Sequence, residues 1–159
     1  MTVTLVRKTN NLEKLAKRLQ KLSRTHVSSG YFGEQGDHPE IKLKYSVLML
    51  IHENGMFNNP ARPVRTITTF KMKAYGKAWA KDISKYLYHN LHLEELLDKI
   101  GKDTTEVAQS VFGTPQLEAN SPVTVELKGF NSPLVDSGLL RANWSWRGSV
   151  DHQIKNTAF

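Results

Sequence analysis

Cysteine is absent from this sequence of 159 residues. Its absence excludes disulfide frameworks, zinc–thiolate sites and thiol catalysis. Long hydrophobic runs are lacking too, since the longest extends only from Val47 to Ile51, far too short to span a bilayer. Residues 1–8 also lack the apolar stretch of a secretory signal. We therefore expect a protein that folds in the cytoplasm and has no contact with membranes.

Sequence motifs of catalysis and metal binding are missing as well. No phosphate-binding GxxxxGKS/T loop, dinucleotide-binding GxGxxG turn or HExxH zinc motif is present. His52-Glu53 begins like the zinc motif, but no second histidine follows at the required spacing. Only His89 and His92 lie close together in the sequence, and no third ligand is near them. The sequence therefore predicts neither a metal site nor a cofactor.

Ser137 follows Asp136, which raises the question of a nucleophilic serine. Such a serine needs a base within hydrogen-bond reach and a strained turn. The simpler interpretation is that Asp136 or Ser137 caps a short helical turn. The neighbouring Glu94 and Glu95 face different directions on a helix and form no acid–base pair. We therefore expect that the protein is not an enzyme.

Positive charge is concentrated in two segments. The formal net charge is +7, and residues 1–24 and residues 61–92 each carry seven Lys or Arg side chains against one acidic side chain. One interpretation is a nearby polyanion such as DNA. The other, which we favour, is that solvated helix faces meet acidic neighbours in an assembly. The candidate DNA-proximal cations are Lys71, Lys73, Lys77 and Lys81.

Apolar spacing predicts an alternation of helices and strands. Leucines at steps of three and four predict a first helix from residue 12 to 22, capped by Asn10 or Asn11. Gly76 lies inside the longest predicted helix, where it favours a kink or a close helix contact. The other predicted elements are a strand at 25–33, a loop at 34–40, a helix at 44–54 closed by Gly55, a long basic helix at about 64–89 opened by Pro63, a helix at 93–112, a loop-rich segment at 116–136, and a strand from 142 to about 150.

These elements, long helices between strand-like ends, predict an α+β fold. The length favours one domain, which we place at residues 1–150, followed by a polar C-terminal tail at residues 151–159. Trp144 and Trp146 stand two apart, so both face one side of the predicted strand. Exposed tryptophans stack on bases, but two on one strand face are more typical of a core or a subunit interface.

Three segments, taken in order, resemble a known family. They are VSSGYFG at residues 27–33 with Gly36, His38 and Pro39; YSVLMLIHENG at 45–55 followed by NPARP at 59–63; and NSPVTV at 120–125 with Lys128, Gly129 and PLVDSGLLR at 133–141. Together they are similar to the tail-completion, or neck, proteins of long-tailed bacteriophages, which are also called minor tail or virion morphogenesis proteins. In that family a helix ending in "IHE-G" leads into "PARP", and "PL-D-G-LR" precedes a strand.

The resemblance implies an α+β fold in which helices pack on an antiparallel sheet. It also implies a non-catalytic subunit of the virion, made in the cytoplasm of the bacterial host. Such subunits form a ring, expected to be sixfold, between the head connector and the tail tube, and DNA passes through the lumen without sequence-specific binding. The implied partners are other copies of the chain, head connector or portal-adaptor proteins, and tail-tube or tail-terminator proteins. The implied interface residues are Asn59, Pro60, Ala61, Arg62, Pro63, Leu134, Asp136, Gly138, Leu140 and Arg141.

Two alternatives remain beside this hypothesis. A tail terminator, which caps the tail tube, has a similar size, fold class and ring symmetry, and the sequence does not separate the two. A basic nucleic-acid-binding module would use the first helix and the helix at residues 64–89. Salt-dependent binding to duplex DNA distinguishes that module from a ring subunit.

Overall fold

The fold is α+β, as the sequence predicts. A computed structural model of the chain describes residues 11–150, so the predicted tail at residues 151–159 lies outside the described residues. The helices are α1 (Asn11–Ser23), α2 (Tyr45–Asn54), α3 (Val64–Met72), α4 (Gly76–Tyr88), α5 (Leu93–Gln109), α6 (Pro122–Lys128) and α7 (Leu139–Ala142), with 3-10 turns η1 (Gly33–Gln35) and η2 (Lys73–Tyr75); the strands are β1 (Thr25–Gly30) and β2 (Ser145–Val150).

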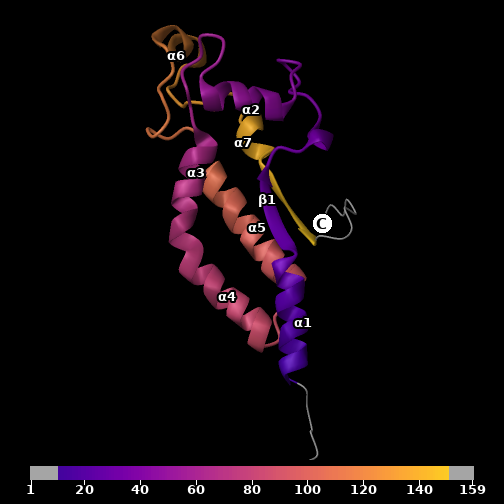
Figure 1. Cartoon of the computed structure of the whole chain (residues 1–159). Helices are drawn as coiled ribbons and strands as arrows, with labels where there is room; N and C mark the ends of the chain where they lie inside the picture. Colours follow the sequence, from indigo (N-terminus) through magenta and orange to yellow (C-terminus); the bar gives the residue numbers. More distant parts are fainter. Residues whose placement is uncertain (1–10, 151–159) are drawn as a thin grey trace, which may run out of the picture.

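The molecule is elongated in Figure 1, and its two ends differ. Helices α2, α6 and α7 lie together at one end, whereas α1 and the last turns of α4 lie at the other. Helix α5 runs between them, with α3 and α4 on one side and the strands on the other. We call residues 33–63 and 113–138 the α2–α6 end, and residues 64–88 the α3–α4 flank. Between residues 11 and 150, no helix is both long and apolar enough to cross a membrane.

The sheet is a single antiparallel pair. β1 pairs with β2 in a register that runs from Thr25 opposite Val150 to Gly30 opposite Ser145. The pair packs on α5, where the indole of Trp146 fills the space that a side chain at position 101 would occupy. Gly101 is therefore a packing requirement, because any Cβ there would overlap the indole.

The buried side chains form two clusters along the molecule. One surrounds α2, α7 and the last turns of α5, and includes Tyr45, Leu48 and Trp144. The other joins α4 to the first turns of α5, and Trp146 packs against it from the sheet. The prediction that Trp144 and Trp146 are core residues is confirmed, because Trp144 is buried and Trp146 packs against the second cluster. Trp144 precedes β2, however, so the two rings serve different clusters and do not share one strand face.

The predicted long basic helix is present as two helices joined by a 3-10 turn. The interruption expected near Gly76 is confirmed, because η2 ends directly before it and α3 and α4 meet at a bend in Figure 1. Gly76 itself is helical, with φ −52° and ψ −40°, and has open space around its Cα. The bend therefore comes from the 3-10 turn and not from a close contact at the glycine.

Several predicted boundaries shift in the structure. The segment at 116–136, predicted to be rich in loops, contains α6. The first strand ends at Gly30, and η1 begins at Gly33, where the strand was predicted to end. Pro63 precedes α3 as its N-cap and is not its first residue. The predicted left-handed cap at Gly55 is confirmed, with φ 68° and ψ 52°.

Candidate functional site

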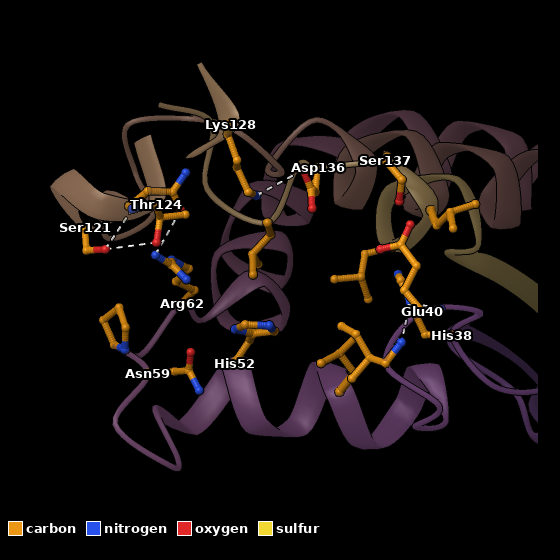
Figure 2. Close-up of a pocket in the computed structure, with 18 of the residues that line it drawn as sticks. His38, Glu40, His52, Asn59, Arg62, Ser121, Thr124, Lys128, Asp136 and Ser137 are labelled. Atoms are coloured by element: carbon orange, nitrogen blue, oxygen red, sulfur yellow. Dashed lines mark hydrogen bonds and ion pairs between the residues drawn. The ribbon is translucent and has the colours of Figure 1, made fainter. Parts of the chain in front are cut away.

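A pocket with a volume of about 330 Å³ opens at the α2–α6 end. Figure 2 shows it between α2, the segment that contains Ser121 and Thr124, and the segment around Asp136 and Ser137. The second and third segments of the family resemblance, which are far apart in the sequence, meet here. Seven of the ten predicted interface residues line the pocket: Asn59, Pro60, Arg62, Leu134, Asp136, Gly138 and Leu140.

Arg62 joins the two sides of this end. Its guanidinium is buried, and it donates from Nε to the Glu118 carbonyl (2.8 Å) and from an Nη to the Ala119 carbonyl (3.0 Å). The same Nη reaches the side-chain oxygen of Asn120 at 3.2 Å. Burial lowers the pKa of Arg62, and Glu118 opposes that shift. Arg62 therefore acts inside the chain, holding the loop after α2 against the segment before α6.

The loop after α2 is fixed in a tight conformation. The backbone N–H of Arg62 donates to the carbonyl of His52 (2.6 Å), and Asn59 donates from its backbone to the Met56 carbonyl (3.1 Å). A Cβ on Gly55 would lie 2.7 Å from the backbone nitrogen of Ala61, so only glycine fits there. The loop is therefore ordered by its own hydrogen bonds and by one required glycine.

Lys128 closes the other side of the pocket. Its ammonium donates to the Val135 carbonyl (3.1 Å) and lies 3.8 Å from a carboxylate oxygen of Asp136. The expectation that Asp136 or Ser137 caps the following turn is wrong. The N-cap of α7 is Gly138, at φ 78°, and no side chain accepts a hydrogen bond from this helix start. The left-handed conformation of Gly138 sets the direction of the chain into α7, so no polar cap is needed.

His52 lies on the pocket face of α2 and is held neutral. Burial, followed by the positive charges of Arg62 and Lys128, lowers its pKa to about 4. Its Nδ1 is buried and has no hydrogen-bond partner among residues 11–150. An imidazole with this pKa carries no charge at pH 7, so His52 does not bind anions there by charge.

The polar side chains of this pocket make contacts that hold the chain in place. Within the described part of the chain, Ser137 makes no side-chain hydrogen bond to a base. His38 is buried, and its Nδ1 accepts from the backbone N–H groups of Glu40 (3.3 Å) and Ile41 (3.4 Å), so it stabilises a turn. No group of three or more His, Asp or Glu side chains in residues 11–150 is arranged to hold a metal ion.

The other predicted interface residues lie outside the pocket. Ala61 and Arg141 are exposed, and Pro63 is half-buried. Leu134 and Leu140, which do line the pocket, are themselves buried, with only 7% and 9% of their surfaces exposed. Because buried side chains pack within one chain, these leucines support the surface and the exposed neighbours form it.

The predicted basic residues lie on the α3–α4 flank. Lys73, Lys77 and Lys81 are exposed, and Lys71 is half-buried. Among the described residues none of the four forms an ion pair, although the Lys73 ammonium lies 5.3 Å from the centre of the Phe70 ring. Their side chains are therefore available to a partner.

One acidic side chain interrupts the flank. Asp82 is buried and accepts hydrogen bonds from the ammonium groups of Lys99 and Lys85, the second at 2.9 Å. These two hydrogen bonds, that from Lys99 first, lower the pKa of Asp82. Asp82 balances one of these two ammonium charges, and the flank cations that form no ion pair among the described residues are Arg65, Lys71, Lys73, Lys77 and Lys81.

Comparison with family models, with curated proteins and with solved structures finds no match for this chain. The function of the chain is therefore inferred from its own residues, above all those that line the pocket.

The sequence did not lead us to α6, and it gave His38, His52 and Lys128 only as members of the three motif segments and not as site residues. The signals for α6 were present. Ser121 is its N-cap and accepts from the Thr124 N–H at 3.2 Å, proline follows as the first helical residue, and Gly129 ends it at φ 77°. A serine cap, a proline at the first position and a terminal glycine together are a helix signature.

Proposed function

We propose that this chain is a structural subunit of the head–tail junction of a bacteriophage, a tail-completion or neck protein that forms a ring between the head connector and the tail tube. The observation that carries the proposal is the convergence of residues 59–63 and 133–141 on one end of the molecule. These segments carry most of the resemblance to neck proteins. A surface that combines residues 59–63 with residues 133–141 suits docking to a partner, because its shape is set only when the whole chain has folded.

The character of that end supports the same function. Its polar side chains hold loops in place, and the pocket residues bring together no base with a nucleophile. Ordered loops suit docking, since little conformational entropy remains to be lost when a partner binds. Exposed apolar side chains on α2 and α6 surround these loops, as expected of a surface that another protein covers.

Inactivation of the gene in the phage that carries it tests the proposal. We expect electron micrographs of the lysate to show DNA-filled heads and separate tails, with joined virions restored by the wild-type gene supplied in trans. A tail terminator caps the growing tube, so its loss gives tails of uncontrolled length instead. Normal, infectious virions without the gene product would overturn both assignments.

A further inference from the structure

Helix α2 carries exposed apolar side chains on the face that the chain does not bury, beside the polar Ser46 and Asn54. Tyr45, Leu48 and Met49 are buried against α7 and α5. A surface helix normally carries a single apolar stripe, which faces the core. The opposite face of α2 therefore has the character of a surface that is covered in an assembly. Its exposed apolar stripe consists of Leu43, Val47 and Leu50.

The loop after α2 extends this apolar stripe. Phe57 is 77% exposed, and both Phe57 and Asn58 have left-handed backbone conformations, with φ 55° and 61°. Such conformations cost roughly 1–2 kcal/mol for each residue that is not glycine. Arg62 and Gly55 hold the loop in this conformation. A strained loop that presents an exposed phenylalanine is a feature of binding surfaces.

Charge separates this end from the flank. The α2–α6 end carries seven acidic side chains and four Lys or Arg, including the buried Arg62, and α7 adds Arg141 at the same end of the molecule, for a net charge of −2. The α3–α4 flank carries six Lys or Arg and one acidic side chain, for a net charge of +5. The flank also has an exposed aromatic side chain, Phe70, beside Lys73. The two surfaces are therefore complementary in charge, and each carries exposed apolar side chains.

From these features we propose that the α2–α6 end of one copy docks on the α3–α4 flank of a second copy. Leu43, Val47, Leu50 and Phe57 pack around Phe70, and acidic side chains of the end face Lys73, Lys77 and Lys81. α2 lies at one end of the molecule and α4 along its side (Figure 1), so we expect the exposed face of α2 to reach the α4 side chains of another copy. This inference rests on the proposed function, because an end-to-flank contact is heterologous, the kind of contact from which rings are built.

The absence of cysteine makes a direct test possible. We would prepare the full chain with a single thiol, as Leu50→Cys or as Phe70→Cys, mix the two variants at high concentration and oxidise them. Oxidation traps even weak contacts, because each disulfide accumulates once formed. The matched control pairs Phe70→Cys with Leu12→Cys, since Leu12 is 72% exposed on α1, which lies at the opposite end of the molecule from α2.

We expect at least about tenfold more disulfide between the Leu50→Cys and Phe70→Cys chains than in the control mixture, which corresponds to roughly 1.4 kcal/mol of preferential contact. Lys77→Glu in the Phe70→Cys chain should return the yield to the control level. Equal yields in both mixtures would overturn the inference, as would an excess of Leu50→Cys homodimer, which indicates two α2 ends in contact.

A DNA-binding role for the flank gives a different result. If Lys77→Glu abolished binding to a duplex oligonucleotide and left the disulfide yield unchanged, the end-to-flank contact would be wrong. The failure of this inference is also distinguishable from that of the proposed function. Separate heads and tails without the preferred disulfide would contradict the contact alone, whereas the preferred disulfide with normal virions would contradict the neck assignment alone.

Discussion

The α2–α6 end and the α3–α4 flank obtain their order in different ways. The end consists of short helices and loops, and a few buried or half-buried polar side chains, above all Arg62 and Lys128, fix their positions. The flank is nearly continuous helix, held by packing against α5 and by the ion pairs of Asp82. A surface built from loops therefore depends on single polar contacts, whereas a helical surface tolerates changes in its exposed side chains.

The largest effect is expected from Arg62→Met at the α2–α6 end. Loss of three hydrogen bonds from a buried guanidinium leaves the Glu118 and Ala119 carbonyls without donors, which should lower the free energy of unfolding by about 3 kcal/mol. Urea unfolding followed by tryptophan fluorescence measures this loss in the free energy of unfolding. Arg65→Met on the exposed face of α3 is the matched control, with an expected change within about 0.5 kcal/mol. Equal effects of the two substitutions would show that the end does not depend on Arg62.

A second comparison uses two glycines in helices. Gly101→Ala should destabilise by about 2–3 kcal/mol, because its Cβ overlaps the Trp146 indole that joins the sheet to α5. Gly76→Ala should stabilise by up to about 1 kcal/mol, since Gly76 is helical with open space around it. Thermal unfolding of both variants measures the difference, and effects of the same sign would contradict this account of the bend between α3 and α4.

The pH dependence of stability tests the burial of His52. The pKa of His52 is about 4 in the folded chain and 6.5 in a model compound. Between these two pH values His52 is therefore protonated in the unfolded chain and neutral in the folded chain. Stability is fully present above about pH 6.5 and falls as the pH decreases toward 4, by about 1–2 kcal/mol after discounting for partial exposure. Unfolding free energies of the wild type and His52→Gln, measured at pH 7 and 4.5, isolate this contribution.

His89→Gln is the control for that comparison, because His89 is exposed. It should retain the pH dependence of the wild type. A His52→Gln variant with the same pH dependence as the wild type would contradict the low pKa of His52.

The smallest effect on the isolated chain is expected from Leu50→Asp. Leu50 is 57% exposed, so its substitution should change the free energy of unfolding by no more than about 0.5 kcal/mol. Urea unfolding measures this change. If Leu50→Asp destabilised the monomer by several kcal/mol, the outer face of α2 would be part of the core and not a docking surface.

The sequence was sufficient for the elements that have strong local signals. Leucine spacing located α1, and Asn54-Gly55 located the end of α2 together with its left-handed cap. The α+β class with an antiparallel sheet was also predicted, whereas the pairing of β1 with β2 was not. Periodicity and glycine conformation are local properties, and for this reason they can be read without knowledge of the fold.

The candidate site was predictable only in part. Residues 59–63 and 133–141 were singled out by resemblance, but the buried clamp of Arg62 on Glu118 and Ala119 depends on tertiary contacts between distant segments. The role of Asp136 was mistaken for the same reason, since its ion pair with Lys128 depends on where α6 lies. Helix α6 was missed despite its Ser121 cap, because Pro122 and Gly129 were interpreted as loop residues and not as the start and end of a helix.

The account's central claim is that the outer face of α2 is covered by another copy of the chain when the head–tail junction assembles. The most direct test is the mass of the complex formed when the purified chain is mixed with the head connector and tail-tube proteins of its phage. We predict a closed ring of several copies for the wild type and, for Leu50→Asp, a folded chain that stays monomeric. A ring that forms equally well with Leu50→Asp, or a wild-type chain that stays monomeric in this mixture, would contradict the claim.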